Sequence, residues 1–192
     1  MNFIQKLLNR STIKYILILF IFVTIISFWF NSYVKSSNDI IFLSDYQFID
    51  SIIKDIENSE KNIYIAIFYF KTDRKNKATE LKQSLIRAKD RGVEIYVVME
   101  QSDKDEITNE VNYLTGKDLE KHGIIVRYDS PFRKLHAKLT IIDEKIVYIG
   151  SHNYTNAALT NNKETSVRIL STKIAKEAIN YIKSIETFEI VK

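Results

Sequence analysis

Four polar side chains that suit work on a phosphate group recur at short spacing in the second half of the chain. His136 and Lys138 stand two residues apart, and Ser151 and Asn153 repeat this spacing further along. In an extended chain, residues two apart point to the same side, so each pair presents both side chains on one face. An imidazole serves as a nucleophile or proton carrier near neutral pH, an ammonium supplies charge, and a hydroxyl and an amide donate hydrogen bonds. Gathered around one point, these groups would bind a phosphate.

The residues between the two pairs predict the strands that position them. Four apolar or β-branched residues separate Lys138 from Asp143, and residues 145–149 are equally rich in strand-forming types. We therefore expect two short strands joined by a tight turn near Asp143 and Glu144. Aspartate is favoured in turns, so we interpret Asp143 as a structural residue.

The complete pattern resembles the signature of the phospholipase D superfamily. That signature reads His, any residue, Lys, four residues, Asp, six residues, Gly-Ser, any residue, Asn, and here it is met without a change of spacing by His136, Lys138, Asp143, Gly150, Ser151 and Asn153. Asn162-Lys-Glu164 is similar to the place where the family often carries an acidic residue. The resemblance therefore implies that Glu164 orients the catalytic histidine and that Gly150, like Asp143, belongs to the structural part of the motif.

The resemblance also implies a mechanism. The motif occurs once in this chain, and the single-motif nucleases of the superfamily complete one active site as a symmetric homodimer. His136 of one subunit would attack phosphorus to form a phosphohistidine, and His136 of the other would protonate the leaving oxygen and later activate water. Lys138, Ser151 and Asn153 would hold the non-bridging oxygens. This scheme requires no metal and no other cofactor.

Helices and strands alternate on both sides of the motif. Helices are expected from a Ser44-Asp45 cap to Ile56, around Leu81 to Gly92, over 107–122, near 154–160 and over 172–188, and strands over 62–70, 93–99, 124–128 and 164–170. Such alternation predicts an α/β domain in which helices cover both faces of a mixed β-sheet, and the resemblance implies the same fold. We predict this catalytic domain over residues 38–192.

The first 37 residues predict a membrane anchor followed by a short linker. Residues 15–30 are apolar apart from Thr24 and Ser27, and the run can extend to Val34. About twenty helical residues span the hydrocarbon core, so a single transmembrane helix over residues 15–34 is expected. The alternative is a cleaved signal peptide, with a secreted domain, although no small-residue cleavage pattern follows the run. The basic residues before the run place the catalytic domain outside the cytoplasm by the positive-inside rule.

Charge and cysteine content limit the function classes. The formal charge is +4, but four basic residues, Lys6, Arg10, Lys14 and Lys35, precede the first acidic residue, Asp39. Without these four, 24 basic residues face 24 acidic ones. The overall basicity is therefore no argument for nucleic-acid binding, although local basic patches are compatible with it. The absence of cysteine excludes disulfides, thiolate metal sites and a cysteine nucleophile.

Other residues near the motif have weaker assignments. Arg133 and Lys134, and the basic loop 71–77, could contact a polyanionic substrate, while Phe132 could stack on a base and Tyr69 is better explained by core packing. His122 precedes a helix-ending glycine and is interpreted as a C-terminal cap. In an extended chain the side chain of His152 would lie on the opposite face from those of Ser151 and Asn153. A zinc site built from the three histidines fits no familiar ligand spacing.

Three functions remain open at this point. The first is a membrane-anchored, metal-independent phosphodiesterase, an endonuclease that cleaves DNA or RNA. The second is a phospholipase D-type enzyme that hydrolyses or transfers phosphatidyl groups, which the anchor favours; against it, the short chain has no obvious second apolar surface for an acyl chain. The third is a non-catalytic module that binds nucleic acid or a protein partner.

Overall fold

The chain divides into two units, Met1–Asp39 and Ile40–Lys192. The computed structural model describes residues 10–36, 39–73 and 75–188, so predictions for Lys6, residues 37–38 and Arg74 lie outside the described residues. The first unit contains helix α2 (Arg10–Ser36). Within it, Thr12–Trp29 is long enough and apolar enough to cross a membrane, and no residue of this stretch is buried.

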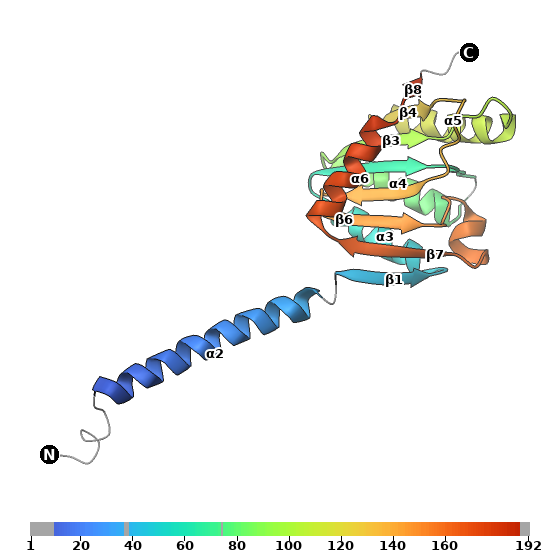
Figure 1. Ribbon diagram of the computed structural model, residues 1–192. Coiled ribbons are helices and arrows are strands. Elements are labelled where there is room, and N and C mark those ends of the chain that lie inside the picture. Colours follow the sequence, from blue (N-terminus) through green and yellow to red (C-terminus); the bar gives the residue numbers. More distant parts are fainter. Residues whose placement is uncertain (1–9, 37–38, 74, 189–192) are drawn as a thin grey trace. The chain divides into compact units, whose positions relative to one another are not determined.

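An eight-stranded mixed sheet forms the centre of the second unit, in the order β1-β7-β6-β5-β2-β3-β4-β8 (Figure 1). The strands are β1 (Ile40–Ser44), β2 (Asn62–Ile67), β3 (Glu94–Met99), β4 (Ile125–Asp129), β5 (Lys138–Ile142), β6 (Ile146–Gly150), β7 (Thr165–Leu170) and β8 (Thr187–Phe188). β2, β3 and β4 pair in parallel, and the other neighbouring strands pair antiparallel.

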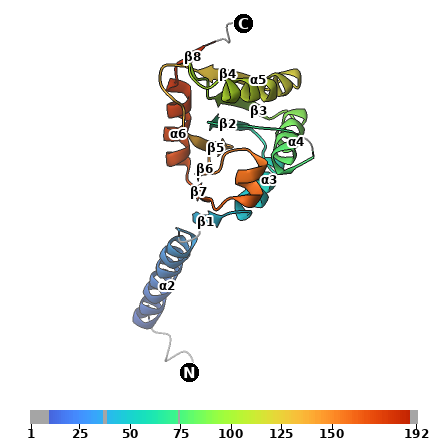
Figure 2. The same cartoon turned by 90° about the vertical axis from the view of Figure 1, so that its right-hand side faces the viewer.

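Helices cover both faces of this sheet (Figure 2). The helices are α3 (Gln47–Glu57), α4 (Lys77–Asp90), α5 (Glu106–Lys121) and α6 (Thr172–Ser184), with a short π-helix, η1 (Ala157–Asn161). α3, α4 and α5 pack on one face, and α6 packs on the other, over β6, β5 and β2. The predicted α/β fold with a mixed sheet between helices is confirmed.

Strand β2 shows why its sequence is apolar at nearly every position. Ile63 and Ile65 join the core under α3 and α4, whereas Ala66 joins the core under α6. A strand that is covered on both faces must bury its alternating side chains on both sides. The two cores therefore follow from a single uninterrupted hydrophobic run.

The predicted hairpin is present as β5 and β6, with Ile142 opposite Ile146. Asp143 and Glu144 occupy the turn with φ of 53° and 57°, as in a type I′ turn. The Asp143 side chain is buried and accepts hydrogen bonds from the amides of Glu60 (3.1 Å) and Lys61 (2.8 Å). Asp143 therefore fixes the entry to β2 against the turn, as a structural residue.

We expect Asp143→Ala to lower the free energy of unfolding by about 2–3 kcal/mol, because it leaves part-buried amides without an acceptor. Urea denaturation measures the change. Glu144→Ala, at the neighbouring exposed position of the same turn, should change stability by less than about 1 kcal/mol. Equal losses in the two variants would show that the turn backbone, and not the Asp143 carboxylate, accounts for the effect.

Two helix boundaries differ from the prediction. Ser44 does not cap a helix: it ends β1, its amide donates to Gln47 Oε1 (3.1 Å), and α3 begins at Gln47. Strand β1 was missed because a short apolar run has no periodicity that separates strand from helix. At the other end, α6 stops at Ser184, since Ile185 is extended (φ −65°, ψ 122°), and 187–188 pair with β4.

The helical period predicts Ile174, Ala178, Ile182 and Ile185 as the buried stripe of α6, and of these four only Ile182 is buried. Its buried residues are Ala175, Ile179 and Ile182, whereas Ile174 is 38% exposed. Ala178 and Ile185 pack only at the margin of the core. The helix is therefore rotated relative to the predicted stripe, and Ile174 faces an open part of the sheet.

Candidate active site

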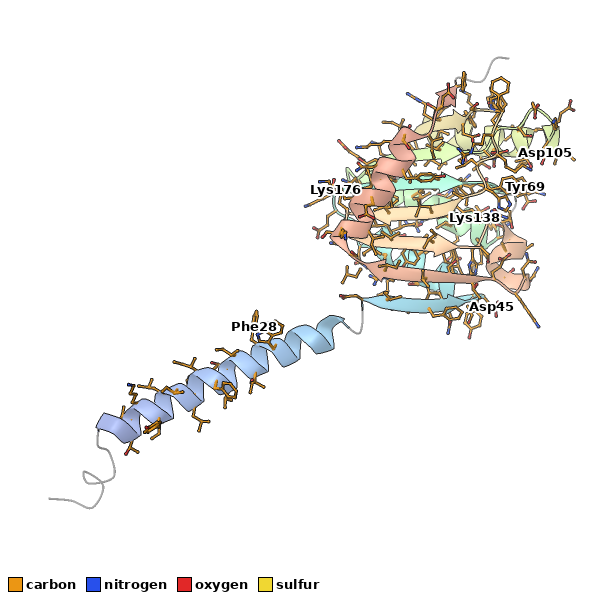
Figure 3. All side chains as sticks on the ribbon, viewed as in Figure 1. Phe28, Asp45, Tyr69, Asp105, Lys138 and Lys176 are labelled. Carbon is orange, nitrogen blue, oxygen red and sulfur yellow. The ribbon has the colours of Figure 1, made fainter. Side chains whose placement is uncertain are left out.

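His136 and Lys138 lie together at one edge of the sheet, as their spacing predicts. Lys138 opens β5 and pairs with Ile67, the last residue of β2, so both residues lie where β2 ends. Lys138 Nζ is 3.3 Å from His136 Nδ1 and donates to the His136 carbonyl at 2.9 Å. Figure 3 shows Lys138 at the same end of the strands as Tyr69. An imidazole and an ammonium therefore share one small region of the surface.

Phe68 supports these groups and was not identified from the sequence. Its ring centroid is 4.7 Å from that of His136, and the ammonium groups of Lys138 and Lys134 lie 4.9 Å and 5.4 Å from the Phe68 ring centroid. An aromatic face attracts cations at such distances. Phe68 follows β2 directly, but its role depends on the pairing of β2 with β5, which no local sequence pattern reveals.

The electrostatic environment favours a neutral His136. Burial lowers the pKa of His136, and the positive charges of Lys138 and Lys134 lower it further. Burial also lowers the pKa of Lys138, while the charge of Glu164 acts in the opposite direction. An unprotonated imidazole has a free lone pair, so His136 is suited to nucleophilic attack at neutral pH.

We expect Lys134→Gln to raise the pKa of His136, because the variant removes one of the charges that disfavour the imidazolium. NMR titration of the His136 ring proton measures this pKa without a substrate. Lys54→Gln is the matched control, since Lys54 is exposed on α3, which packs on the other face of the sheet. If the pKa of His136 is the same in Lys134→Gln and in Lys54→Gln, the charge of Lys134 does not lower it.

Ser151 and Glu164 lie side by side where β6 meets β7. The Ser151 hydroxyl donates to the Glu164 carboxylate and accepts from the Thr165 amide (3.1 Å). Asn162 Nδ2 donates to the other Glu164 oxygen at 3.0 Å. Among the described residues of this single chain, Glu164 forms no hydrogen bond with His136. Its predicted role in orienting the histidine stays a prediction.

His152 and Asn153 differ in how their polar atoms are bonded. His152 is fully buried, stacks on Phe48 (4.3 Å between ring centroids), and contacts Ser166 Oγ (2.7 Å) and the Asp45 carbonyl (3.0 Å). A carbonyl only accepts, so His152 Nε2 carries the proton. Asn153 Oδ1 is buried and has no hydrogen-bond partner among the described residues. His152 thus packs in the core and fixes the backbone after β6, whereas the side-chain oxygen of Asn153 has no hydrogen-bond donor among the described residues.

Gly150 is required by close packing of two strands. A Cβ at this position would lie 2.4 Å from Ser166 Cα and 2.4 Å from the Thr165 carbonyl oxygen. Both are backbone atoms of β7, which cannot move aside as the end of a flexible side chain can. The glycine lets the chain carry Ser151 past β7 at this distance.

The predicted accessory cations fall into two groups. Arg133 and Lys134 line a cavity of about 440 Å³ together with Phe132, Tyr181 and Glu186. Phe132 is 86% exposed. By contrast, two lysines of the loop 71–77 are ion-paired within their own segment, Lys71 with Asp73 and Lys77 with Glu80. Of the two groups, Arg133 and Lys134 are therefore the better placed to bind a polyanion.

An apolar groove opens directly beside His136, contrary to the expectation that no such surface exists. Besides His136 and Lys138 it is lined mainly by apolar residues of β5, β6, β7 and α6, among them Leu139, Val147, Ile149, Ile169 and Ile174. α6 covers only part of its face of the sheet, so a surface remains open beside it. The groove could not be predicted from the sequence, because the residues that line it come from four separate segments.

No group of three or more His, Cys, Asp or Glu side chains is arranged to hold a metal ion in the part of the chain that the structure describes. His122 is the C-cap of α5 and is exposed, as predicted from the glycine that follows it. His152 is enclosed in the core. The three histidines therefore do not converge on one point.

A family model described as cardiolipin synthase, PLD-like domain, matches residues 52–186, which include every residue of the motif. The chain belongs to this family. The resemblance to the phospholipase D superfamily is thereby confirmed, and the match runs from within α3 to the end of α6, with β1 and β8 outside it. Residues 1–39, with helix α2, lie outside it.

Curated relatives share parts of this domain. Cardiolipin synthase B of Shigella flexneri is 28% identical over 122 residues, which cover 57% of this chain and 28% of that protein. Mitochondrial cardiolipin hydrolase of Mus musculus is 44% identical over 46 residues, or 24% of this chain and 21% of that protein. The chain thus spans about a quarter of the length of these relatives.

Solved structures share the fold. The phospholipase D family member Nuc from Salmonella typhimurium superposes with a TM-score of 0.66 at 21% identity, over 80% of this chain and 99% of that one. Phosphatidylserine synthase from Haemophilus influenzae superposes with a TM-score of 0.63 at 20% identity, over 78% and 37% of the two chains. At these identities the likeness concerns the fold alone.

Proposed function

We propose that this protein is a phosphodiesterase that cleaves its substrate through a covalent intermediate on His136. The observation that carries the proposal is the contact of His136 with Lys138, at 3.3 Å between Nδ1 and Nζ, in surroundings that lower the pKa of both groups. A neutral imidazole attacks phosphorus, the bond to the leaving oxygen breaks, and water later releases the phosphoryl group from the ring. Lys138 stabilises the charge that develops on the non-bridging oxygens. Ser151 does the same once its hydroxyl turns from Glu164, to which it donates in the free chain, to the substrate.

A second histidine must supply the proton for the leaving oxygen, and a second copy of the chain would provide it. The other two histidines of this chain do not fit that task, because His152 is buried and His122 caps α5. In a symmetric dimer, each copy contributes one His136 to a shared site. The two rings then titrate as a pair, which allows one neutral and one charged ring at the start of the reaction.

The open part of the sheet beside α6 is the surface that we assign to this dimer. Ile40 opposes Ile169 and Phe42 opposes Val167, so the exposed side chains of β1 continue the face that carries the groove. Ile40 is 63%, Phe42 64% and Ile149 47% exposed. These residues form a contiguous apolar patch that ends at His136. A second copy of the chain would cover this patch and bring the two His136 side chains close together.

Ile174→Asp, which places a charge in the groove, should therefore convert a dimer into a monomer in sedimentation experiments in detergent. Ile107→Asp is the matched control, because Ile107 is 72% exposed on α5, on the other face of the sheet. A wild-type protein that is monomeric at all concentrations, or an Ile174→Asp variant that stays dimeric, would remove the support for this interface.

Nucleic acid is the substrate class that we place first. Three cations, Lys138, Lys134 and Arg133, surround His136 or the cavity next to it, and the exposed ring of Phe132 lies on the same cavity. Cations track a phosphate backbone and an exposed aromatic ring stacks on bases. This arrangement supports an endonuclease that cleaves DNA or RNA.

A phosphatidyl substrate is the second candidate, and a specific observation favours it. The apolar groove begins at His136 and Lys138 themselves, where an acyl chain could lie if no second copy covered it. The curated relatives named as cardiolipin synthases and cardiolipin hydrolase point to the same chemistry. In this case the enzyme would hydrolyse or transfer phosphatidyl groups.

We assign residues 1–37 the role of a single-pass membrane anchor and residues 38–192 the catalytic role. The support is helix α2, whose stretch Thr12–Trp29 has the length and composition of a membrane span. By the positive-inside rule the catalytic domain lies outside the cytoplasm. Protease treatment of intact cells checks this orientation, since only an external domain would be digested.

The deciding experiment gives the full chain in detergent three labelled substrates, DNA, RNA and a phosphatidyl lipid, in excess chelator. Cleavage of DNA or RNA without lipid turnover supports the nuclease, and lipid turnover with intact nucleic acid supports the second candidate. If a folded, dimeric protein leaves all three substrates intact, the phosphodiesterase proposal is wrong and a binding module becomes the better explanation.

A further inference from the structure

Two buried carboxyl groups lie beneath the segment that leads to His136. Glu100 follows β3 and Asp129 ends β4, so both stand at the ends of two neighbouring parallel strands. Glu100 is 1% and Asp129 is 4% exposed. Among the described residues neither group has an ion pair. Buried carboxylates without a cationic partner are rare, because burial without compensation is unfavourable.

The contacts of this pair reach the backbone beside the proposed nucleophile. Glu100 Oε2 accepts a hydrogen bond from the amide of Leu135 at 2.6 Å, and Leu135 directly precedes His136. Asp129 Oδ1 accepts from the Gln101 amide at 3.1 Å. The Glu100 carbonyl in turn accepts from Asn112 Nδ2 of α5 at 3.0 Å. The Glu100 side chain thus connects the segment before His136 to the end of β3.

Burial disfavours the ionised form of both carboxyl groups. Burial raises the pKa of Glu100 to about 7, and the charge of Asp129 raises it further, while the Leu135 amide and Lys134 act against this rise. Burial raises the pKa of Asp129 to about 6. Two neighbouring buried carboxyl groups cannot easily both ionise, so the titration belongs to the pair.

We propose that Glu100 and Asp129 are positioning residues for His136: the Glu100 carboxyl group, held beside Asp129, clamps the backbone at Leu135 and so fixes the imidazole for attack. This inference rests on the proposed role of His136 and adds two residues to it. Glu100 acts on His136 through the amide of Leu135, and Asp129 acts through its effect on Glu100.

The clamp makes the site sensitive to alkaline pH. When both carboxyl groups are ionised, two negative charges face each other in a buried place. Their repulsion opposes the arrangement in which Glu100 accepts from the Leu135 amide, although that amide by itself favours an ionised Glu100. The cavity that Asp129 lines also carries Arg133, Lys134 and Glu186, so it offers charged groups of both signs and a path for water. Asn112, the contact from α5, is neutral.

Stability should follow the same titration. The folded chain keeps a proton that an unfolded glutamate, with an ordinary pKa near 4.5, has already released. The folded state therefore loses stability as the pH rises from that value through about 7. Glu100→Gln cannot release this proton and should lack the loss.

The test compares Glu100→Gln with Glu100→Ala. Glutamine keeps an oxygen for the Leu135 amide and places a neutral group beside Asp129, so we expect wild-type kcat at pH 6 within about 2-fold, and no decline of activity through pH 7 and 8. Alanine removes the acceptor of the Leu135 amide. We expect kcat to fall about 10²-fold with little change in KM, because misplacement of a reacting group lowers the rate by about this factor. A merely structural role would lower the melting temperature of Glu100→Ala and leave its kcat unchanged.

Hydrogen exchange at the Leu135 amide gives a readout that needs no substrate. In the wild type, its protection should drop between pH 6 and pH 8, and in Glu100→Gln it should stay constant. Asp129→Asn gives a second variant if Glu100→Ala does not fold. If protection of the Leu135 amide does not depend on pH in the wild type, or drops equally in Glu100→Gln, the positioning role of Glu100 is wrong even if the enzyme is active. If the exchange is as expected but the enzyme is inactive, the proposed function is wrong instead.

Discussion

His136→Ala is expected to lower the rate of phosphodiester cleavage by about 10⁴-fold or more, the scale seen when a covalent nucleophile is removed. The ring lies 4.7 Å from Phe68 and contacts Lys138, and no other described histidine in the chain is near enough to replace it. Denaturing the enzyme during turnover of a substrate with labelled phosphorus should leave label on His136 in the wild type and none in the variant. Steady-state rates and the trapped label are measured together.

His122→Ala is the matched control for this substitution. It makes the same chemical change at an exposed C-cap outside the site, so its rate should stay within about 2-fold of the wild type. Dimers that mix wild-type and His136→Ala chains test the shared site further. If both rings are needed, activity falls as the square of the wild-type fraction; a linear fall would mean that each chain works alone.

Gly150→Ala is expected to destabilise the folded state by about 3 kcal/mol or more, at the upper end of what overpacking costs. The new methyl group would lie 2.4 Å from Ser166 Cα and from the Thr165 carbonyl oxygen, so β6 and β7 must separate where they carry Ser151 and Glu164. Activity should be lost with stability, because the separation moves both side chains. Urea denaturation monitored by circular dichroism gives the change.

Gly123→Ala is the control for the substitution itself. Gly123 has a φ of 76°, and the nearest atom to an added Cβ is Lys89 Cε at 3.4 Å. Alanine there meets only the strain of a left-handed backbone, roughly 1–2 kcal/mol. If Gly150→Ala costs no more than this control, the packing of β6 against β7 is looser than these distances require.

Local patterns in the sequence determined much of this protein. Two short runs of apolar and β-branched residues predicted β5 and β6, and two acidic residues marked their turn at Asp143 and Glu144, because strand and turn preferences act over a few neighbouring residues. Gly92 and Gly123 marked the ends of α4 and α5, and both have positive φ. The motif was visible for the same reason: a strand period of two fixes which of its side chains point to one side.

The sequence did not reveal what depends on segments far apart in the chain. Phe68 meets His136 only because β2 pairs with β5, and Glu100 reaches Leu135 only because β3 and β4 end side by side. The groove beside His136 combines residues of three strands and α6, and β1 was missed because four apolar residues in a row fit a strand or a helix equally. Local preference chose the elements and the reactive side chains of this protein. Strand order and burial, which depend on contacts between distant residues, decided what surrounds those side chains and what charge they carry.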